Sequence, residues 1–358
     1  MIVRSAAQGI IWGLVVCGPL AVQRYWVGEA VSNDPSETPL TVLKDDKIKV
    51  EATIAPQKGG ELSGLKIQHK GNWIETIYLA RDYCPRRDWT GKAPFLWPAT
   101  GRNFPPDLEA RQKAGECFNT GAYELNGNRY EMPIHGFARD LPWRVVRAAV
   151  IDRRAVAKLA VRDTPETRNR YPFGFMIEAL YTLEEGVLSI GYRIVASETN
   201  SGPMPFSVGN HITFVSPLVQ GTDPSDMELV TPSKTELLKT SCGLATSESR
   251  PRSHAEGVKL GGFERLSAVS LTGYEDAPYI VYRDPQGLAI RMSHTASEIP
   301  RQPVILYNIW GDISGSFFSP EPWVGLQNSL VLNKGLVRLR PGRVFEWTIR
   351  IEFDRNQH

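Results

Sequence analysis

The chain has 358 residues, of which 42% are hydrophobic and 22% charged, an ordinary balance for a globular protein with a sizeable core. Its 41 basic and 39 acidic side chains give a formal net charge of +2. That value is too close to neutral to indicate a nucleic-acid or membrane-surface partner. The 31 glycines and 26 prolines imply many turns, which favours short strands over long helices.

The first thirty residues differ from the rest of the chain. Arg4 precedes an uncharged run at 9–22, and a positive charge followed by a short apolar segment is typical of a secretory signal. The run is shorter than the roughly 20 apolar residues of a membrane span, and a buried N-terminal helix is the alternative. Small residues at 28–30 offer a cleavage point. We therefore expect residues 1–30 to be a signal peptide or a signal anchor, and the protein to be exported to the periplasm or the extracellular space, either released or tethered to the membrane.

Strand-like segments begin after a polar stretch. Residues 31–45 contain prolines and are predicted to be a linker. Residues 47–54 alternate strictly between polar and apolar side chains, as a half-buried strand does, and 65–69 and 73–78 are similar. The irregular segment 80–120 is rich in Pro, Arg, Asp and Gly, which predicts a long loop of the kind that tends to be functional.

The remaining pattern is that of an antiparallel β-protein. Asn126-Gly127 lies between two short strand candidates and is a strong hairpin signal. Further strand candidates are 143–150, 155–161, 175–183, 187–196, 206–208, 268–271, 279–282, 288–293, 304–309, 330–332 and 345–353. Short strands at this spacing, without an internal repeat, predict one large antiparallel β-sandwich over residues 46–358.

The chain has four cysteines, at Cys17, Cys84, Cys117 and Cys242. Their spacing, together with that of the histidines, resembles no metal site. In an oxidising compartment we expect Cys84 and Cys117 to form a disulfide near the mouth of the functional site. The alternative is that all the cysteines after the signal are free thiols.

Four segments carry a resemblance to a known family. They are PATGR at 98–102, YELNGNRYEMPIHGFARDLPWRV at 123–145, YPFGFMIEALYTLEEGVLSIGYRIVASETNSGPMPFSVGNHITF at 171–214 and FSPEPWVG at 318–325. In this order they resemble the aldose 1-epimerases (galactose mutarotases), in the branch with the HGFAR motif that includes hexose-6-phosphate epimerase relatives. The resemblance implies a galactose mutarotase-like β-supersandwich and an isomerase that interconverts the α and β anomers of a free hexose.

The resemblance also implies the residues of the site. Glu321, between two prolines, matches the family's general base, and His211, in Gly-Asn-His, matches its general acid. His135 matches a second family histidine and Arg102 the substrate-binding arginine, whereas Trp323 is expected to cover an apolar face of the sugar. A carboxylate and an imidazole suit ring opening and reclosure because both can be tuned towards neutral pH. This chemistry requires no metal and no organic cofactor.

Three functions fit these residues. The first is aldose 1-epimerisation by a monomer or a dimer, and the second is carbohydrate binding without catalysis on the same fold. The pair of Glu321 and His211 favours the enzyme, because binding alone needs no acid–base pair. The third is hexose-6-phosphate 1-epimerisation, for which Arg86, Arg87 and Arg111 could supply positive charge. Export argues against a phosphorylated substrate, whereas three convergent basic groups beside Glu321 would favour one.

Overall fold

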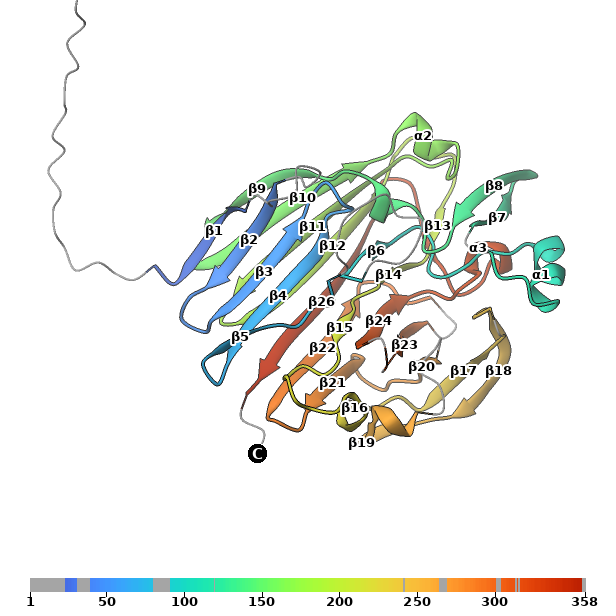
Figure 1. Ribbon diagram of the computed structural model, residues 1–358. Coiled ribbons are helices and arrows are strands. Elements are labelled where there is room, and N and C mark those ends of the chain that lie inside the picture. Colours follow the sequence, from blue (N-terminus) through green and yellow to red (C-terminus); the bar gives the residue numbers. More distant parts are fainter. Residues whose placement is uncertain are drawn as a thin grey trace, which may run out of the picture.

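The computed structural model describes residues 23–30, 39–79, 91–118, 120–240, 242–263, 269–300, 304–312, 314 and 316–355. Most of the described residues lie in antiparallel strands, which form a nine-stranded, an eight-stranded and a five-stranded sheet together with two short pairs (Figure 1). The predicted all-β antiparallel architecture is therefore confirmed.

The nine-stranded sheet forms one layer of the sandwich. In spatial order its strands are β19 (His254–Lys259), β16 (Glu228–Thr231), β21 (Tyr279–Asp284), β22 (Leu288–Ala296), β26 (Val344–Asp354), β12 (Val187–Ala196), β11 (Phe175–Glu184), β10 (Arg154–Arg162) and β9 (Arg144–Ile151). Burial alternates strictly along β11 and β12. One face of these strands is therefore in the core and the other is nearer to solvent.

The eight-stranded sheet belongs to the opposite layer and contains most of the candidate site. Its strands are β18 (Ala245–Pro251), β17 (Thr235–Lys239), β20 (Val269–Thr272), β23 (Ile305–Asp312), β24 (Phe317–Val324), β14 (Val208–Asn210) and β6 (Phe95–Leu96), with β15 (Phe214–Val215) also paired to β24. Every residue of β24 is buried, so this strand has no alternating pattern by which sequence analysis could have found it.

The five-stranded sheet completes this second layer and corrects the predicted domain boundary. It consists of β1 (Tyr25–Ala30), β2 (Leu40–Asp45), β3 (Val50–Ala55), β4 (Glu61–His69) and β5 (Asn72–Glu75). In Figure 1 these blue strands lie across the green strands β9 to β12, and β1 and β2 contact that part of the nine-stranded sheet. The predicted cleavage point at 28–30 is thus inside a paired strand, and the last six residues of the predicted linker form β2.

A buried carboxylate holds the N-terminal strand in place. Asp45 is fully buried and accepts hydrogen bonds from Arg24 Nε at 3.1 Å and Nη2 at 3.0 Å. It also accepts from the backbone N–H groups of Ile48 and Gly186. Residues 1–22 and 31–38, which carry most of the predicted signal and linker, lie outside the described residues.

Short elements connect the sheets. They are the pair β7 (Thr120–Leu125) and β8 (Asn128–Pro133), the pair β13 (Met204–Phe206) and β25 (Val337–Leu339), the helices α1 (Pro106–Lys113), α2 (Pro165–Arg168) and α3 (Ser329–Leu332), and the 3₁₀ turns η1 (Ala138–Asp140), η2 (Pro224–Asp226) and η3 (Leu260–Gly262).

The hairpin predicted at Asn126-Gly127 is confirmed, with both residues at positive φ. The strand predicted at 330–332 is wrong, since α3 occupies it, and β6 and α1 lie within the predicted long loop. No helix in the described part of the chain is long and apolar enough to span a membrane.

Aromatic side chains join the two layers in the core. Phe95 of β6 stacks on Tyr192 of β12 with ring centroids 4.4 Å apart, and Tyr282 of β21 packs on Phe318 of β24 at 4.9 Å. Both contacts join the nine-stranded to the eight-stranded sheet. Burial of such large rings contributes about 1.5–3 kcal/mol each, so these contacts fix the eight-stranded sheet, and the site on it, against a rigid layer.

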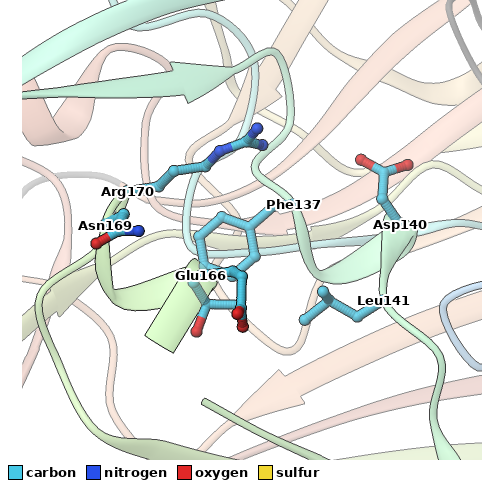
Figure 2. Close-up of a pocket in the computed structure, with 7 residues that line it drawn as sticks. Phe137, Asp140, Leu141, Glu166, Asn169 and Arg170 are labelled. Carbon is cyan, nitrogen blue, oxygen red and sulfur yellow. The ribbon is translucent and has the colours of Figure 1, made fainter. Parts of the chain in front are cut away.

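A hollow of about 330 Å³ lies where the η1 turn approaches α2 (Figure 2). Phe137, Asp140 and Leu141 line it from the η1 side. From the α2 side it is lined by Glu166, Thr167, Asn169 and Arg170. None of the predicted site residues lines this hollow.

Candidate active site

Strand register brings the two predicted catalytic residues together. Glu321 of β24 is directly opposite Asn308 of β23. β14 and β15 both pair with the other edge of β24, and they do so in the same register. His211 lies between β14 and β15 in the chain, so this register places it opposite Glu321. Because residues opposite one another in a sheet share a face, Asn308, Glu321 and His211 form one cross-strand row.

Two prolines explain why the sheet is interrupted at this row. Pro320 and Pro322 flank Glu321 and have no N–H to donate to a neighbouring strand. Pairing with β23 is continuous along β24, whereas the pairing on the other edge stops between β14 and β15. The His211 N–H donates instead to the carbonyl of Pro94 at 2.9 Å. The backbone of His211 is therefore held by the residue that precedes β6, while its ring faces β24.

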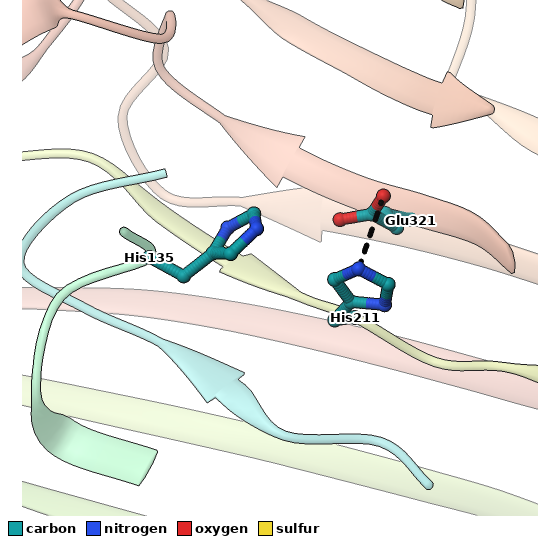
Figure 3. A group of neighbouring side chains, drawn as sticks. All are labelled: His135, His211 and Glu321. Carbon is teal, nitrogen blue, oxygen red and sulfur yellow. Dashed lines mark ion pairs between the residues drawn. The ribbon is translucent and has the colours of Figure 1, made fainter. Parts of the chain in front are cut away.

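Three of the predicted residues meet in one cluster (Figure 3). His211 Nε2 lies 3.7 Å from Glu321 Oε1. The ring of His135 is nearly perpendicular to that of His211, with centroids 5.3 Å apart. Among the described residues, these three side chains also form a group that could hold a metal ion, since their ligand atoms all lie within 4.8 Å of one another. Two imidazoles and a carboxylate are donors that zinc accepts, and they are equally the groups of acid–base catalysis.

A tight turn after β8 presents His135 to the site. His135 has a φ of +66° and Gly136 a φ of +71°. A Cβ on Gly136 would lie 2.1 Å from the carbonyl oxygen of Trp97, so only glycine fits there. The N–H of Gly101 donates to His135 Nδ1 at 3.1 Å. The neutral ring therefore carries its proton on Nε2 and can donate a hydrogen bond to a ligand oxygen.

Burial sets the protonation of the acid–base pair. It raises the pKa of Glu321 to about 8, against the opposing effects of the Asn308 hydrogen bond, the Lys239 charge and the Trp323 hydrogen bond. Burial also lowers the pKa of His211 to about 3. At neutral pH the Glu321–His211 pair of the empty site thus holds one titratable proton, on Glu321, with His211 neutral. This is the reverse of the predicted starting state, in which Glu321 is ionised and His211 protonated.

Arg102 and a disulfide brace the rim of the site. Arg102 Nε donates to the Phe118 carbonyl at 2.9 Å, and Nη1 donates to the Cys242 carbonyl at 3.1 Å. Cys117 and Cys242 are disulfide-bonded, with Cα atoms 5.4 Å apart. The predicted pairing of Cys84 with Cys117 is therefore wrong, and Cys84 itself lies outside the described residues. Arg102 fastens the same two segments as the disulfide does.

The aromatic residue expected to cover the sugar has a different position. Trp323 is only 1% exposed, and its Nε1 donates to Glu321 Oε2 at 3.2 Å. It orients the carboxylate rather than offering a face to a ligand. The half-buried Trp310 lies edge-on to His211, with centroids 5.5 Å apart, and packs on Phe317 at 5.0 Å. Trp310 is two residues from Asn308 on β23, so it shares the face of the row.

Sequence analysis missed the polar residues behind Glu321. Asn308 Nδ2 donates to Glu321 Oε1 at 2.7 Å, and Lys239 Nζ donates to Asn308 Oδ1. No local motif marks these residues, and only the strand register brings them to the site. Burial lowers the pKa of His135 well below its usual value, and the nearby charges of His211, Arg139, Arg102 and Lys239 lower it further.

A family model matches part of the chain. The family model described as aldose 1-epimerase matches residues 113–261. The matched segment, less than half of the chain, is thus similar to the aldose 1-epimerases. His135 and His211 lie within the matched residues, whereas Arg102 and Glu321 lie outside them.

Solved structures of similar fold extend the likeness to almost the whole chain. A galactose mutarotase-like protein from Clostridium acetobutylicum is 19% identical, with a TM-score of 0.72 over 93% of this chain and 99% of that one. The galactose 1-epimerase from Lactobacillus acidophilus NCFM is 14% identical, with a TM-score of 0.67 over 94% and 100%. Identities this low show the fold alone, and the galactose mutarotase-like fold predicted for this aldose 1-epimerase-like chain is confirmed.

A curated relative is similar over a shorter stretch. Protein LacX of Lactococcus lactis subsp. lactis is 24% identical over 172 residues, which are 48% of this chain and 50% of LacX. The chain thus spans about half the length of the curated relatives it matches. Membership of the HGFAR branch stays a prediction.

Proposed function

We propose that this protein is an aldose 1-epimerase that interconverts the α and β anomers of a free hexose. The observation that carries the proposal is the contact between His211 and Glu321. The two groups lie 3.7 Å apart, and burial shifts their pKa values to about 3 and about 8. Between those limits the pair holds one proton, which is what a reaction that removes one proton and adds another requires.

The proposed reaction passes that proton through the sugar. Glu321, protonated in the empty site, donates to the ring oxygen while neutral His211 accepts the proton of the anomeric hydroxyl. The bond between the anomeric carbon and the ring oxygen breaks, and the anomeric carbon becomes an aldehyde. After rotation about the adjoining carbon–carbon bond, His211 returns its proton to the aldehyde oxygen and Glu321 recovers the proton of the ring hydroxyl. The pair is regenerated, and no redox step occurs.

The other residues of the cluster bind the sugar in this proposal. His135 donates from Nε2 to a sugar oxygen, because its Nδ1 is occupied by the Gly101 N–H. Trp310 covers an apolar face of the ring beside His211. Arg102 completes the rim through its remaining N–H groups.

Substitution of the pair tests the proposal. Glu321→Gln and His211→Asn should each lower the rate of mutarotation of fresh α-glucose or α-galactose, followed by polarimetry, by roughly 10²–10⁴-fold. Glu275→Gln is a matched control, because Glu275 is exposed and pairs with Lys234 at the surface. Wild-type rates in both site variants would contradict the mechanism. A wild-type protein that binds an aldose without mutarotating it would instead be a carbohydrate-binding protein.

One observation favours an acidic sugar as a second candidate substrate. Arg102, Arg139 and Lys239 all act on His135 as positive charges, and Glu321 and Glu236 are carboxylates that act on Lys239. Three basic groups beside Glu321 were the condition set above for a phosphorylated substrate, because they could neutralise the phosphate of a hexose 6-phosphate. Of the arginines proposed from sequence for this role, Arg111 is exposed and pairs with Glu116, and the other two lie outside the described residues. Comparison of kcat/KM for glucose and glucose 6-phosphate, measured by NMR exchange between anomers, separates the two substrates.

A further inference from the structure

A lysine that no motif marks lies directly behind the acid–base pair. Lys239 is the last residue of β17, and its Nζ donates to Asn308 Oδ1. The same Nζ lies 5.6 Å from the centroid of the Trp323 ring. Both partners also contact Glu321, because Asn308 Nδ2 donates to Oε1 at 2.7 Å and Trp323 Nε1 donates to Oε2 at 3.2 Å. Lys239 therefore touches both groups that hold the carboxylate.

The ammonium group determines which way the Asn308 amide points. A lysine ammonium has three donors and no acceptor, so it is satisfied only by the amide oxygen. Ser270 Oγ also donates to Asn308 Oδ1, at 3.2 Å. A reversed amide would direct its NH₂ group at the ammonium, donor against donor. With Lys239 in place, the NH₂ group must point at Glu321.

The positive charge of Lys239 favours the ionised form of Glu321, as the hydrogen bond from the Asn308 amide does. Asn308, Ser270 and Glu321 are all buried, and burial disfavours the ionised carboxylate. The positive charge of Lys239 opposes this effect and lowers the pKa of Glu321. Burial in turn lowers the pKa of Lys239 to about 7, against the attraction of Glu321 and Glu236. The other charged or titratable groups at this site are His135, His211, Arg102 and Arg139.

We propose that Lys239 is a positioning residue for the acid–base pair: through Asn308 it fixes the amide that holds Glu321, and it keeps the carboxyl proton transferable. The inference rests on the proposed function for its kinetic consequence, but the contacts that carry it do not depend on the substrate. Lys239 reaches Glu321 through Asn308 and Trp323.

Kinetics of Lys239→Met test this role. Without the cation Glu321 becomes a weaker acid, so kcat should fall roughly 10-fold. The alkaline limb of kcat/KM should move up by about one pH unit or more, the size of shift that a nearby opposite charge produces. KM for glucose should change less than about threefold, because His135, Trp310 and Arg102, which bind the uncharged sugar in the proposed function, are intact. Lys239→Arg keeps the charge and should retain more activity than Lys239→Met. The control Lys234→Met removes an exposed lysine next to the start of the same strand and should resemble the wild type.

A double-mutant cycle separates action through Asn308 from a general loss of charge. In a protein that already carries Asn308→Leu, Lys239→Met should add clearly less than its effect in the wild type. Additive effects would show that Lys239 does not act through the amide. An unchanged kcat and pH profile in Lys239→Met, or a rise in KM alone, would overturn the proposal, the latter because it indicates contact with the sugar.

A titration without substrate keeps this inference distinct from the proposed function. The Glu321 carboxyl can be followed by carbon-13 NMR in protein labelled at the glutamate side-chain carboxyl, with Glu321→Gln as the assignment control. Its pKa should rise in Lys239→Met even if the protein proves inactive on every aldose. An unchanged titration in that variant would refute the positioning role, whatever the reaction.

Discussion

Replacing Cys117 and Cys242 together by serine should destabilise the folded chain by about 5 kcal/mol. The disulfide joins residues 125 positions apart. Closing a loop of that length removes roughly 16 cal/mol/K of conformational entropy from the unfolded chain, which corresponds to about 5 kcal/mol at 25 °C. Stabilities of whole domains are about 5–15 kcal/mol, so the loss should be plain in urea unfolding of the double variant beside the wild type, and reductant should weaken only the wild type.

The same substitution should also alter substrate binding. Arg102 donates to the carbonyls of Phe118 and Cys242, so freeing the two segments loosens the brace on which its guanidinium rests. KM should rise several-fold while kcat changes little, because Glu321 and His211 are held by other strands. Equal unfolding midpoints and equal KM values in variant and wild type would refute this reasoning. If Cys84→Ser alone reproduced the loss of stability, the pairing predicted from sequence would be the correct one.

Three further predictions concern the site and the N-terminus. The pH profile of kcat/KM should be flat from pH 5 to 6 and fall above about 7, first as Lys239 loses its charge and then as the pair loses the proton held on Glu321. A fall as the pH is lowered from 6 to 5 would contradict the assignment, because the pKa of His211 is lowered to about 3. Gly136→Ala should lower the free energy of unfolding, measured in urea, by at least about 2 kcal/mol and remove most of the activity, because the new Cβ would collide with the Trp97 carbonyl. A stable, fully active variant would show that the turn can relax. A reporter enzyme that works only outside the cytoplasm should be active when fused after Gln23, and activity confined to a cytoplasmic reporter would exclude export.

Local chemistry in the sequence was sufficient for part of the fold. The Asn126-Gly127 turn predicted the observed hairpin, and the strand candidates 175–183 and 187–196 coincide with β11 and β12, because turn and strand signals are local properties. Strand β24 was not predicted, since it is buried throughout and two prolines make its sequence look like a loop. Strand β1 was missed because residues 1–30 were predicted to be a signal, and β2 because the polar, proline-containing stretch 31–45 is typical of a linker.

The candidate site was predictable only where a motif marked it. His135, His211 and Glu321 lie together as the resemblance implied, although their catalytic roles stay predictions. Trp323 was expected to cover a face of the sugar, but it is buried and donates a hydrogen bond to Glu321. A family motif gives the neighbours of a residue in sequence and not the direction of its ring. Lys239 had no motif, and Cys242 offered no sign of its partner, since cysteine spacing alone does not determine connectivity.

The cross-strand row that holds Asn308, Glu321 and His211 also limits how this chain can change in length. Successive side chains of a strand point to opposite faces, so one residue inserted into or deleted from β23 or β24 would turn part of the row from the site towards the other face of the sheet. The side chains of connecting segments do not alternate between two faces in this way, so these segments tolerate insertions more readily. Length variation among functional relatives should therefore gather in the connecting segments, while the number of residues between the β23–β24 turn and Glu321 stays constant.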